Sequence, residues 1–151
     1  MGDINRAFYE GKAAAGRLRK LAEFYDKFSD PYFEFVDGPS YMLVGTWLIE
    51  EDAEYTETAA NFIRTCIKDK WIISGFDWAE WAKHDGAAFL VDHALLMDAE
   101  PIELAKVLTV IFGREHANHG YLVDAYGNGL LLTVLKRAHQ ISAMQPFQEA
   151  A

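Results

Sequence analysis

The chain has very little cysteine and no long apolar run. Its 151 residues include one cysteine, Cys66, so no disulfide can form within the chain. No apolar stretch approaches the roughly 18 residues that a membrane helix needs. The opening residues, M-G-D-I-N-R-A-F, lack the apolar centre of a signal peptide. These absences exclude a disulfide scaffold and a membrane helix, and we expect a cytosolic protein without membrane contact.

Basic residues are also scarce. Lysine and arginine total 14 against 23 aspartates and glutamates, which gives a net charge of −9. Residues 23–57 hold ten acids and one base and so account for the whole imbalance. Such a segment is either a solvated face that keeps the protein soluble or a docking surface for a basic partner. Direct nucleic-acid binding is disfavoured, because phosphate contacts need clustered Lys and Arg.

Catalytic signatures are missing as well. The sequence contains no G-x-S-x-G, no phosphate loop and no dinucleotide fingerprint. Cys66 lies in an apolar row, which is typical of a core residue and not of a reactive thiol. We therefore expect a protein that is not an enzyme and that uses no cofactor.

Apolar residues recur at helical spacing along most of the chain. The composition, 51% hydrophobic and 25% charged, is that of a folded protein. The pattern predicts a mainly α fold, a single domain over residues 1–151 with about five or six helices. The segments expected to be helical are 4–28, Thr56 to about Trp71 (core face Phe62, Ile63, Cys66 and Ile67), a short helix after Asp77, 86–97, Pro101 to a stop at Gly120, and 130–141.

A β-hairpin is expected at 32–49. Two runs rich in aromatic and β-branched residues, Y-F-E-F-V and Y-M-L-V-G-T-W-L-I, flank the turn-like D-G-P-S. Runs of this composition around a Gly-Pro turn are typical of paired strands. A short buried helix would also fit the second run.

The stretch G-F-D-W-A-E-W at 75–81 indicates a helix start. Asp77 and Glu80 have the spacing of a capping box, and Phe76 and Trp81 that of a hydrophobic staple. Neither the capping box nor the staple involves Trp78, so a ligand-facing role for this residue stays open.

Two stretches resemble a known family. They are F-D-W-A-E-W at 76–81 and R-E-H-A-N-H-G-Y-L-V-D-A-Y-G-N-G-L-L-L-T-V-L-K-R at 114–137. Over roughly residues 50–138 the chain resembles the uncharacterised prokaryotic family called domain of unknown function 6508. The pair His116-Ala117 departs from that family's usual arginine-phenylalanine. The resemblance implies a compact, mainly helical domain and no known activity.

The motif E-H-A-N-H at 115–119 is the best candidate for chemistry. On a helix, His116 and His119 share a face. With Glu115, or with Asp92 and His93 from elsewhere, they could form a two-histidine, one-carboxylate metal site, and the alternative function is then a metal-dependent hydrolase. The competing interpretation is that both histidines lie in the last turn of a helix, where their partial positive charge interacts favourably with the negative end of the helix dipole.

We expect a non-enzymatic interaction protein. Its acidic segment would dock on a basic surface of a protein partner, and we expect that partner to belong to an assembly that handles nucleic acid. A phage or mobile-element inhibitor, such as an anti-CRISPR protein, and a housekeeping adaptor both fit this expectation. The sequence does not indicate the oligomeric state. The expected partner-binding residues are Glu50, Glu51, Asp52, Glu54 and Glu57.

Overall fold

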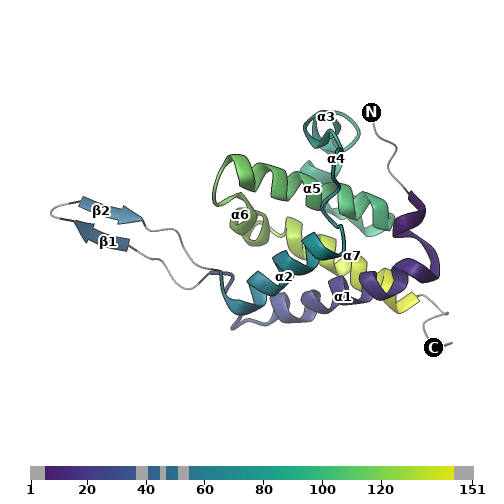
Figure 1. Cartoon of the computed structure of the whole chain (residues 1–151), viewed down its shortest axis with the longest axis horizontal. Coiled ribbons are helices and arrows are strands. Elements are labelled where there is room, and N and C mark those ends of the chain that lie inside the picture. The colour runs from purple at the N-terminus through teal and green to yellow at the C-terminus, as the bar shows by residue number, and fades with distance from the viewer. Residues whose placement is uncertain (1–5, 37–40, 45–46, 51–54, 145–151) are drawn as a thin grey trace.

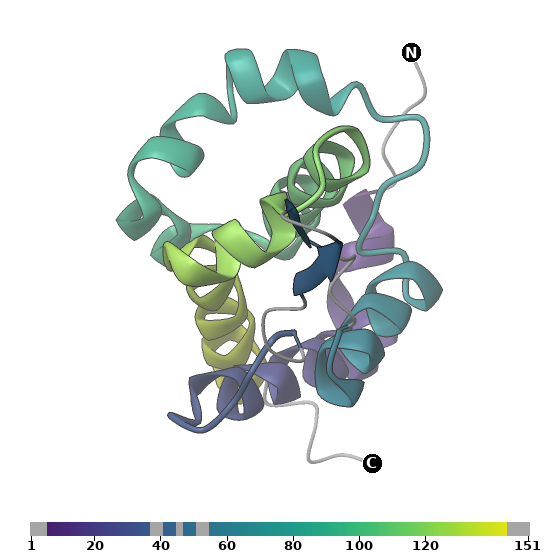
Figure 2. The same cartoon turned by 90° about the vertical axis from the view of Figure 1, so that its left-hand side faces the viewer.

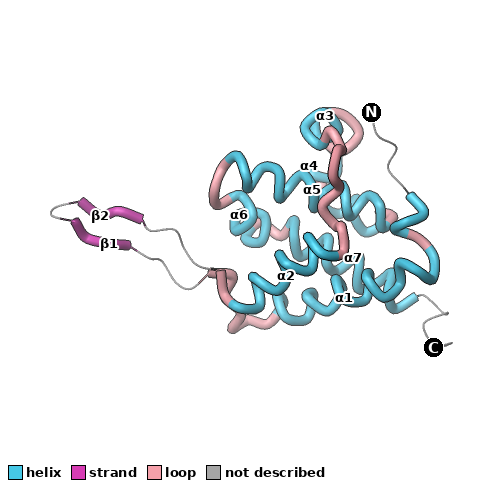
Figure 3. Tube along the Cα trace, in the orientation of Figure 1, coloured by secondary structure: helices cyan, strands magenta, loops and turns pink. Residues whose placement is uncertain are grey.

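Helices make up almost all of the computed structural model, which describes residues 6–36, 41–44, 47–50 and 55–144 (Figure 1, Figure 3). The mainly α fold class is confirmed. No helix in these ranges is both long and apolar enough to cross a membrane. In chain order the elements are the 3-10 helix η1 (Arg6–Tyr9), α1 (Gly11–Ser29), β1 (Tyr41–Val44), β2 (Trp47–Glu50), α2 (Glu57–Lys68), α3 (Trp78–Lys83), α4 (Ala87–Val91), the 3-10 helix η2 (His93–Asp98), α5 (Pro101–Ala117), α6 (Tyr121–Gly127) and α7 (Leu130–Met144).

The core lies around α7. This helix packs along α1 and also contacts α5, α6 and η2. Figure 2 shows α3, α4 and η2 as an arc that passes outside α5 and returns to α7. The largest fully buried side chains come from α1, α2, η2, α5, α6, α7 and the residue Trp71: Trp71, Phe28, Phe62, Leu18, Leu21, Leu96, Leu104, Leu108, Ile111, Leu122, Leu130 and Leu131.

Helix α5 is buried on more than one side, because every residue from Val107 to Ile111 is buried. Pro101 occupies its first turn, where the missing N–H costs nothing. Glu100 and Glu103 form a capping box at its start, which was not predicted from the sequence.

The first predicted helix, at 4–28, is present but is divided into η1 and α1. Gly11 has a φ of +76°, and this left-handed residue separates η1 from α1.

The hairpin exists, but both of its strands come from the second apolar run. Strands β1 and β2 are antiparallel, with Tyr41 opposite Glu50 and Val44 opposite Trp47. The first run, expected to be the partner strand, enters the core instead. The Phe33 ring stacks on Phe28 with centroids 4.6 Å apart, and only Val36 keeps a strand-like bridge, to Tyr55. Aromatic burial at the end of α1 therefore outweighs pairing with residues 41–49.

Helix α2 begins as predicted and ends early. The Thr56 hydroxyl caps it by accepting from the Ala59 N–H. At its end Trp71 N–H donates to Cys66 C=O and Lys70 N–H to Ile67 C=O, the two bonds of a Schellman motif. Lys70 takes the left-handed position, with a φ of +63°. The helix therefore stops at Lys68, three residues before the expected end.

The predicted core face of α2 is wrong at one residue, Ile67. Phe62 and Cys66 are fully buried and Ile63 is half-buried, but Ile67 is 62% exposed. The buried stripe of α2 is Ala59, Phe62 and Cys66, which is narrower than the apolar pattern. Cys66 is a core residue, as expected, because its side chain is fully buried. This burial raises the pKa of its thiol well above the ordinary value.

The start of α3 confirms most of the prediction for 75–81. The Asp77 carboxylate accepts from the Glu80 N–H at 3.1 Å. The Phe76 and Trp81 rings lie 5.9 Å apart, as a staple requires. The Glu80 carboxylate, however, pairs with His84 Nε2 at 2.7 Å. The capping box is therefore incomplete: the Asp77 carboxylate caps the helix, but the Glu80 carboxylate contacts His84, one turn further along the helix.

Gly120 does not end α5. That helix stops at Ala117, and Gly120, with a φ of +103°, is the cap residue before α6. The segment Y-L-V-D-A-Y, which was not among the predicted helices, therefore belongs to a helix of its own. The Glu115 carboxylate accepts from the N–H groups of Gly120 and Leu122. These two bonds turn the chain from α5 into α6.

Replacing Lys70 by glycine should stabilise the protein. The left-handed conformation costs a residue with a Cβ about 1–2 kcal/mol, while glycine adopts it freely. Because glycine is also more flexible when unfolded, we expect a net gain of about 0.5–1 kcal/mol in the free energy of unfolding from denaturant titration. Lys68→Gly, inside the helix, is the control and should lose about 1 kcal/mol. A loss in Lys70→Gly would contradict the Schellman assignment.

Gly113 is predicted to be intolerant of alanine. A Cβ added there would lie under 3.0 Å from the Trp78 ring, whereas one added at Gly16 of α1 meets nothing within 4 Å. Gly113→Ala should therefore destabilise the protein by about 1–3 kcal/mol despite its better helix propensity. Gly16→Ala, the matched control, should stabilise it by about 0.5–1 kcal/mol. Equal gains in thermal denaturation of both variants would show that the ring does not cover Gly113.

Candidate functional site

The acidic residues expected to bind a partner lie at and beyond the hairpin. Glu51, Asp52 and Glu54 fall outside the described residues. Glu50 is the last residue of β2. Glu57 opens α2, is largely exposed, and pairs with Arg64 at 3.1 Å. Both side chains of that pair face water, so its contribution to stability is small.

The hairpin and the acidic run begin and end at one point of the helical body. Val36 and Tyr55 form an antiparallel bridge. Next to it, Thr56 N–H donates to Phe35 C=O at 3.1 Å, and the Thr56 hydroxyl donates to Glu34 C=O at 2.7 Å. We call Val36, Tyr55 and Thr56 the root. The residues that flank segment 37–54, Val36 and Tyr55, are therefore held side by side at the root, and Figure 1 shows β1 and β2 lying well to one side of the helices.

Glu115 connects the root to the end of α5. Its side chain is 12% exposed. One oxygen accepts from Gly120 and Leu122 N–H at 3.0 and 2.9 Å, and the other accepts from the Tyr55 hydroxyl at 3.3 Å. Burial raises the pKa of Tyr55, and the Glu115 carboxylate raises it further. The hydroxyl therefore keeps its proton at neutral pH and can donate.

The histidine motif does not gather into a metal centre. His119 Nδ1 lies 3.0 Å from Glu115 Oε2, and the His119 side chain is 87% exposed. His116 is exposed too, and His93 lies in η2. In the ranges that the structure describes, no three His, Cys, Asp or Glu side chains group as a metal site would need. A metal on Glu115 would also compete with the amide and hydroxyl donors that its oxygens already serve.

The Trp78 ring covers Gly113 of α5, as the close approach of a Cβ at that glycine shows. The residue is half-buried. Its ring thus holds α3 against α5, and the absence of a side chain at Gly113 leaves room for it. This contact gives Trp78 a structural role that the sequence did not reveal, beside the ligand-facing role left open above.

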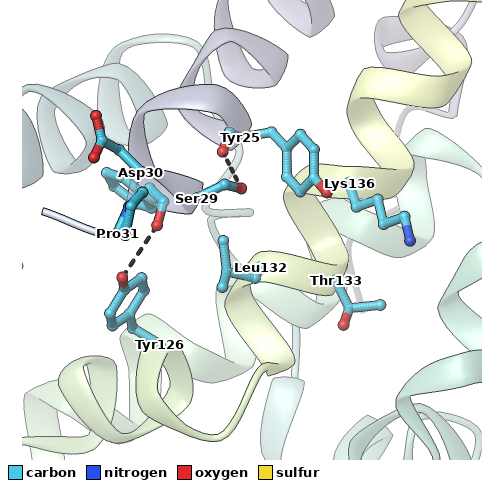
Figure 4. A pocket seen from close by; sticks show the side chains of 9 residues that line it. Tyr25, Ser29, Asp30, Pro31, Tyr126, Leu132, Thr133 and Lys136 are labelled. Carbon is cyan, nitrogen blue, oxygen red and sulfur yellow. Dashed lines mark hydrogen bonds between the residues drawn. The ribbon is translucent and has the colours of Figure 1, made fainter. Parts of the chain in front are cut away.

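An open pocket of about 350 Å³ lies where the end of α1 meets α6 and α7 (Figure 4). The Tyr126 hydroxyl donates to Phe28 C=O at its edge. Leu132 lies between Asp30 on one side and the Lys136 chain on the other (Figure 4). The pocket is lined by Tyr25, Phe28, Ser29, Asp30, Pro31, Tyr126, Leu132, Thr133 and Lys136. The pocket offers aromatic and apolar contact with one charge of each sign, from Asp30 and Lys136.

Sequence reasoning missed the two residues that organise this region. Tyr55 was assigned no role from the sequence, and Glu115 was expected only as a possible metal ligand. They are 60 residues apart in the chain, so no local spacing links them. A clue did exist, because an acidic residue shortly before a glycine and a new helix is suited to accept the free N–H groups of that helix.

The family described as "Family of unknown function (DUF6508)" matches residues 13–144. The chain belongs to the DUF6508 family. The match confirms the resemblance and extends it through α1, which the motifs at 50–138 did not cover. No curated protein matches this DUF6508 chain. No solved structure matches it either.

Glu115→Ala should be strongly destabilising. It would leave two half-buried amides and the Tyr55 hydroxyl without their acceptor, so we expect a loss of about 2–4 kcal/mol in the free energy of unfolding. His116→Ala, one residue along and exposed, is the control and should change it by less than about 0.5 kcal/mol. Urea titration measures both. A loss below about 1 kcal/mol for Glu115→Ala would mean that the α5–α6 corner does not depend on the carboxylate.

Proposed function

We propose that this DUF6508 protein is a non-enzymatic interaction protein that works in the cytosol. Its acidic run, Glu50, Glu51, Asp52, Glu54 and Glu57, docks on a basic surface of a protein partner. The observation that carries the proposal is the root. The acidic run ends on the helical body, because Glu57 opens α2 directly after the bridge between Val36 and Tyr55.

The charge pattern supports a partner that is attracted by electrostatic forces. Five acids in eight residues repel one another, and folding gives no reason to gather them. Glu57 gains from the N-terminus of α2 and from Arg64. The remaining acids are free to create a negative potential that steers a basic partner and raises its association rate.

The partner class follows from the same chemistry. Proteins with extended basic surfaces are commonly those that bind nucleic acid, because phosphate contacts require clustered Lys and Arg. We therefore propose a partner in a nucleic-acid-handling assembly. An inhibitor that occupies such a surface, for example an anti-CRISPR protein, and an adaptor that bridges it to other components would both use the acidic run in this way.

The test begins with an affinity pull-down, followed by surface-based kinetics with the recovered protein. Reversing Glu50, Glu51 and Asp52 to Lys should slow association by about tenfold or more at low salt, with a smaller change in dissociation. Raising salt from about 0.05 to about 0.5 M should weaken the wild-type complex, since the Debye length shrinks.

The matched control reverses three exposed acids elsewhere, Glu23, Asp85 and Asp98, to Lys. It changes the net charge by the same amount but leaves the acidic run intact, so association should slow by less than about threefold. Equal slowing in both variants would assign the effect to overall charge. Unchanged, salt-independent association in the first variant would make the run a solubility device. One bound metal per chain, lost in His119→Ala, would instead favour the metal-dependent hydrolase.

A further inference from the structure

Two open hollows lie along the seam between α1 and α7. The first is the pocket of about 350 Å³ described above, and the second, of about 190 Å³, is lined by residues of α1 and α7. Tyr25 lines the first hollow and His139 the second, and their ring centroids lie 5.5 Å apart, so the hollows are neighbours. Together they form the α1–α7 groove, whose edge on α1 is Arg19, Glu23, Asp26 and Asp30 and whose edge on α7 is Leu132, Lys136, His139 and Ala143.

Each edge of the groove is one face of a helix. Successive residues on both edges are separated by four, three and four positions, which is the spacing of neighbours on a helix surface. The edge from Leu132 to Ala143 is about 16 Å long at the rise of an α-helix. The two helices run antiparallel, because Asp30 shares the first hollow with Lys136 whereas Asp26 shares the second with His139. The groove is therefore about three helical turns long.

The two edges differ in charge. Three of the four residues on the α1 edge are acids, Glu23, Asp26 and Asp30, and all three are exposed. Helix α7 contains no aspartate or glutamate, and its edge presents the exposed side chains of Lys136 and His139. Within the part of the chain that the structure describes, none of these five side chains takes part in a salt bridge. Their charges and polar groups are therefore available to a partner.

An occupant of the groove has to satisfy both edges. A basic helix would be attracted by the acids of α1 but repelled by Lys136 on the other edge. A small ligand would remain largely in water, because both hollows are open, whereas ligand sites bury most of their ligand. A second copy of this chain presents an acidic and a basic edge itself, and so matches both.

Two-fold symmetry brings the unlike edges together. A two-fold axis along the seam places α1 of one copy over α7 of the other. Asp30 and Lys136 line the same hollow, on opposite sides of Leu132 (Figure 4), so they lie at the same level of the groove. Asp30 of each copy then faces Lys136 of the other, and Asp26 faces His139 in the same way. An axis across the seam would instead place acids over acids.

Exposed apolar side chains lie at both ends of the groove. Tyr32 is 91% exposed and follows Asp30 by two residues, and Met144 is 63% exposed and follows Ala143. Large side chains of this kind commonly supply the apolar contacts of an interface. A contact two helices wide and about 16 Å long is smaller than a standard interface, so the association should be reversible and in the micromolar range.

We infer that the α1–α7 groove is the contact surface of a symmetric dimer, in which Asp30 of each copy pairs with Lys136 of the other. The inference goes beyond the proposed function and does not depend on it, because the groove residues lie outside the acidic run. In the proposed function, a dimer would present two acidic runs and would bind a repeated basic surface more tightly than one chain does.

Sedimentation equilibrium of the full chain tests the dimer directly. The wild type should shift from the mass of one chain towards that of two as its concentration rises through about 1–100 µM. Lys136→Glu places an acid opposite Asp30 at two symmetry-related points, so the dissociation constant should rise by about tenfold or more. Adding Asp30→Lys to this variant restores unlike charges, and the double variant should return to within about threefold of the wild type.

Lys83→Glu is the matched control, because it makes the same charge reversal at an exposed residue of α3. Its dissociation constant should stay within about twofold of the wild type. A wild type that stays monomeric at about 500 µM would overturn the inference and leave the groove to another occupant. A dimer that Lys136→Glu does not weaken, or that the double variant does not restore, would overturn it too. These measurements use the protein alone, so their failure is distinct from a failure of the triple reversal to slow association.

Discussion

The packing of α7 along α1 is the interaction on which the rest of the structure depends. Leu131, Val134, Leu135 and Ala138 of α7 are completely buried, and Leu18 and Leu21 of α1 are buried nearly as fully. Each leucine removed from water in this way stabilises the fold by about 1.5–3 kcal/mol. The same helix supplies the surface on which α5, α6 and η2 rest. Loss of this pairing would leave the other elements without a common support.

Long-range hydrogen bonds then attach the parts that bury little apolar area of their own. Arg137 of α7 donates to Ala99 C=O and so holds the chain between η2 and α5. Tyr126 donates to Phe28 C=O and joins α6 to the end of α1. The Glu115 carboxylate accepts from the Tyr55 hydroxyl and from Leu122 N–H, and so attaches the root and the start of α6. These hydrogen bonds place the connecting segments on the apolar core.

Much of this fold could be predicted from local patterns. The apolar stripes identified α1, α5 and α7, and Thr56 and Asp77 are helix caps because their side chains accept the free N–H groups of the first turn. The helix end at Lys70 was missed because the left-handed position usually carries glycine. The strands were misassigned because Y-F-E-F-V suits a strand in composition but finds aromatic partners in Phe28 and Tyr126.

The candidate site was predicted less well than the fold. The acidic run is visible in the sequence, and its role as a docking surface stays a prediction. The bond between Tyr55 and Glu115 could not be predicted, because it depends on how α5 and the start of α2 are placed by the core. The same holds for Trp78, whose place is set by a glycine 35 residues further along the chain. Long-range polar contacts of this kind leave no periodic signal.

The thin attachment of α3 and α4 divides the fluorescence of three of the four tryptophans, Trp71, Trp78 and Trp81, into two reporters. Between Trp78 and Val91 only Ala82 and Gly86 are buried, so this stretch has little apolar area with which to resist local opening. Trp78 and Trp81 lie in it and are half-exposed, whereas Trp71 is 1% exposed and sits against Tyr9 in the core. A local opening of α3 and α4 therefore changes the emission of two indoles in a red-shifted environment, while the blue-shifted emission of Trp71 persists until the pairing of α1 with α7 is lost.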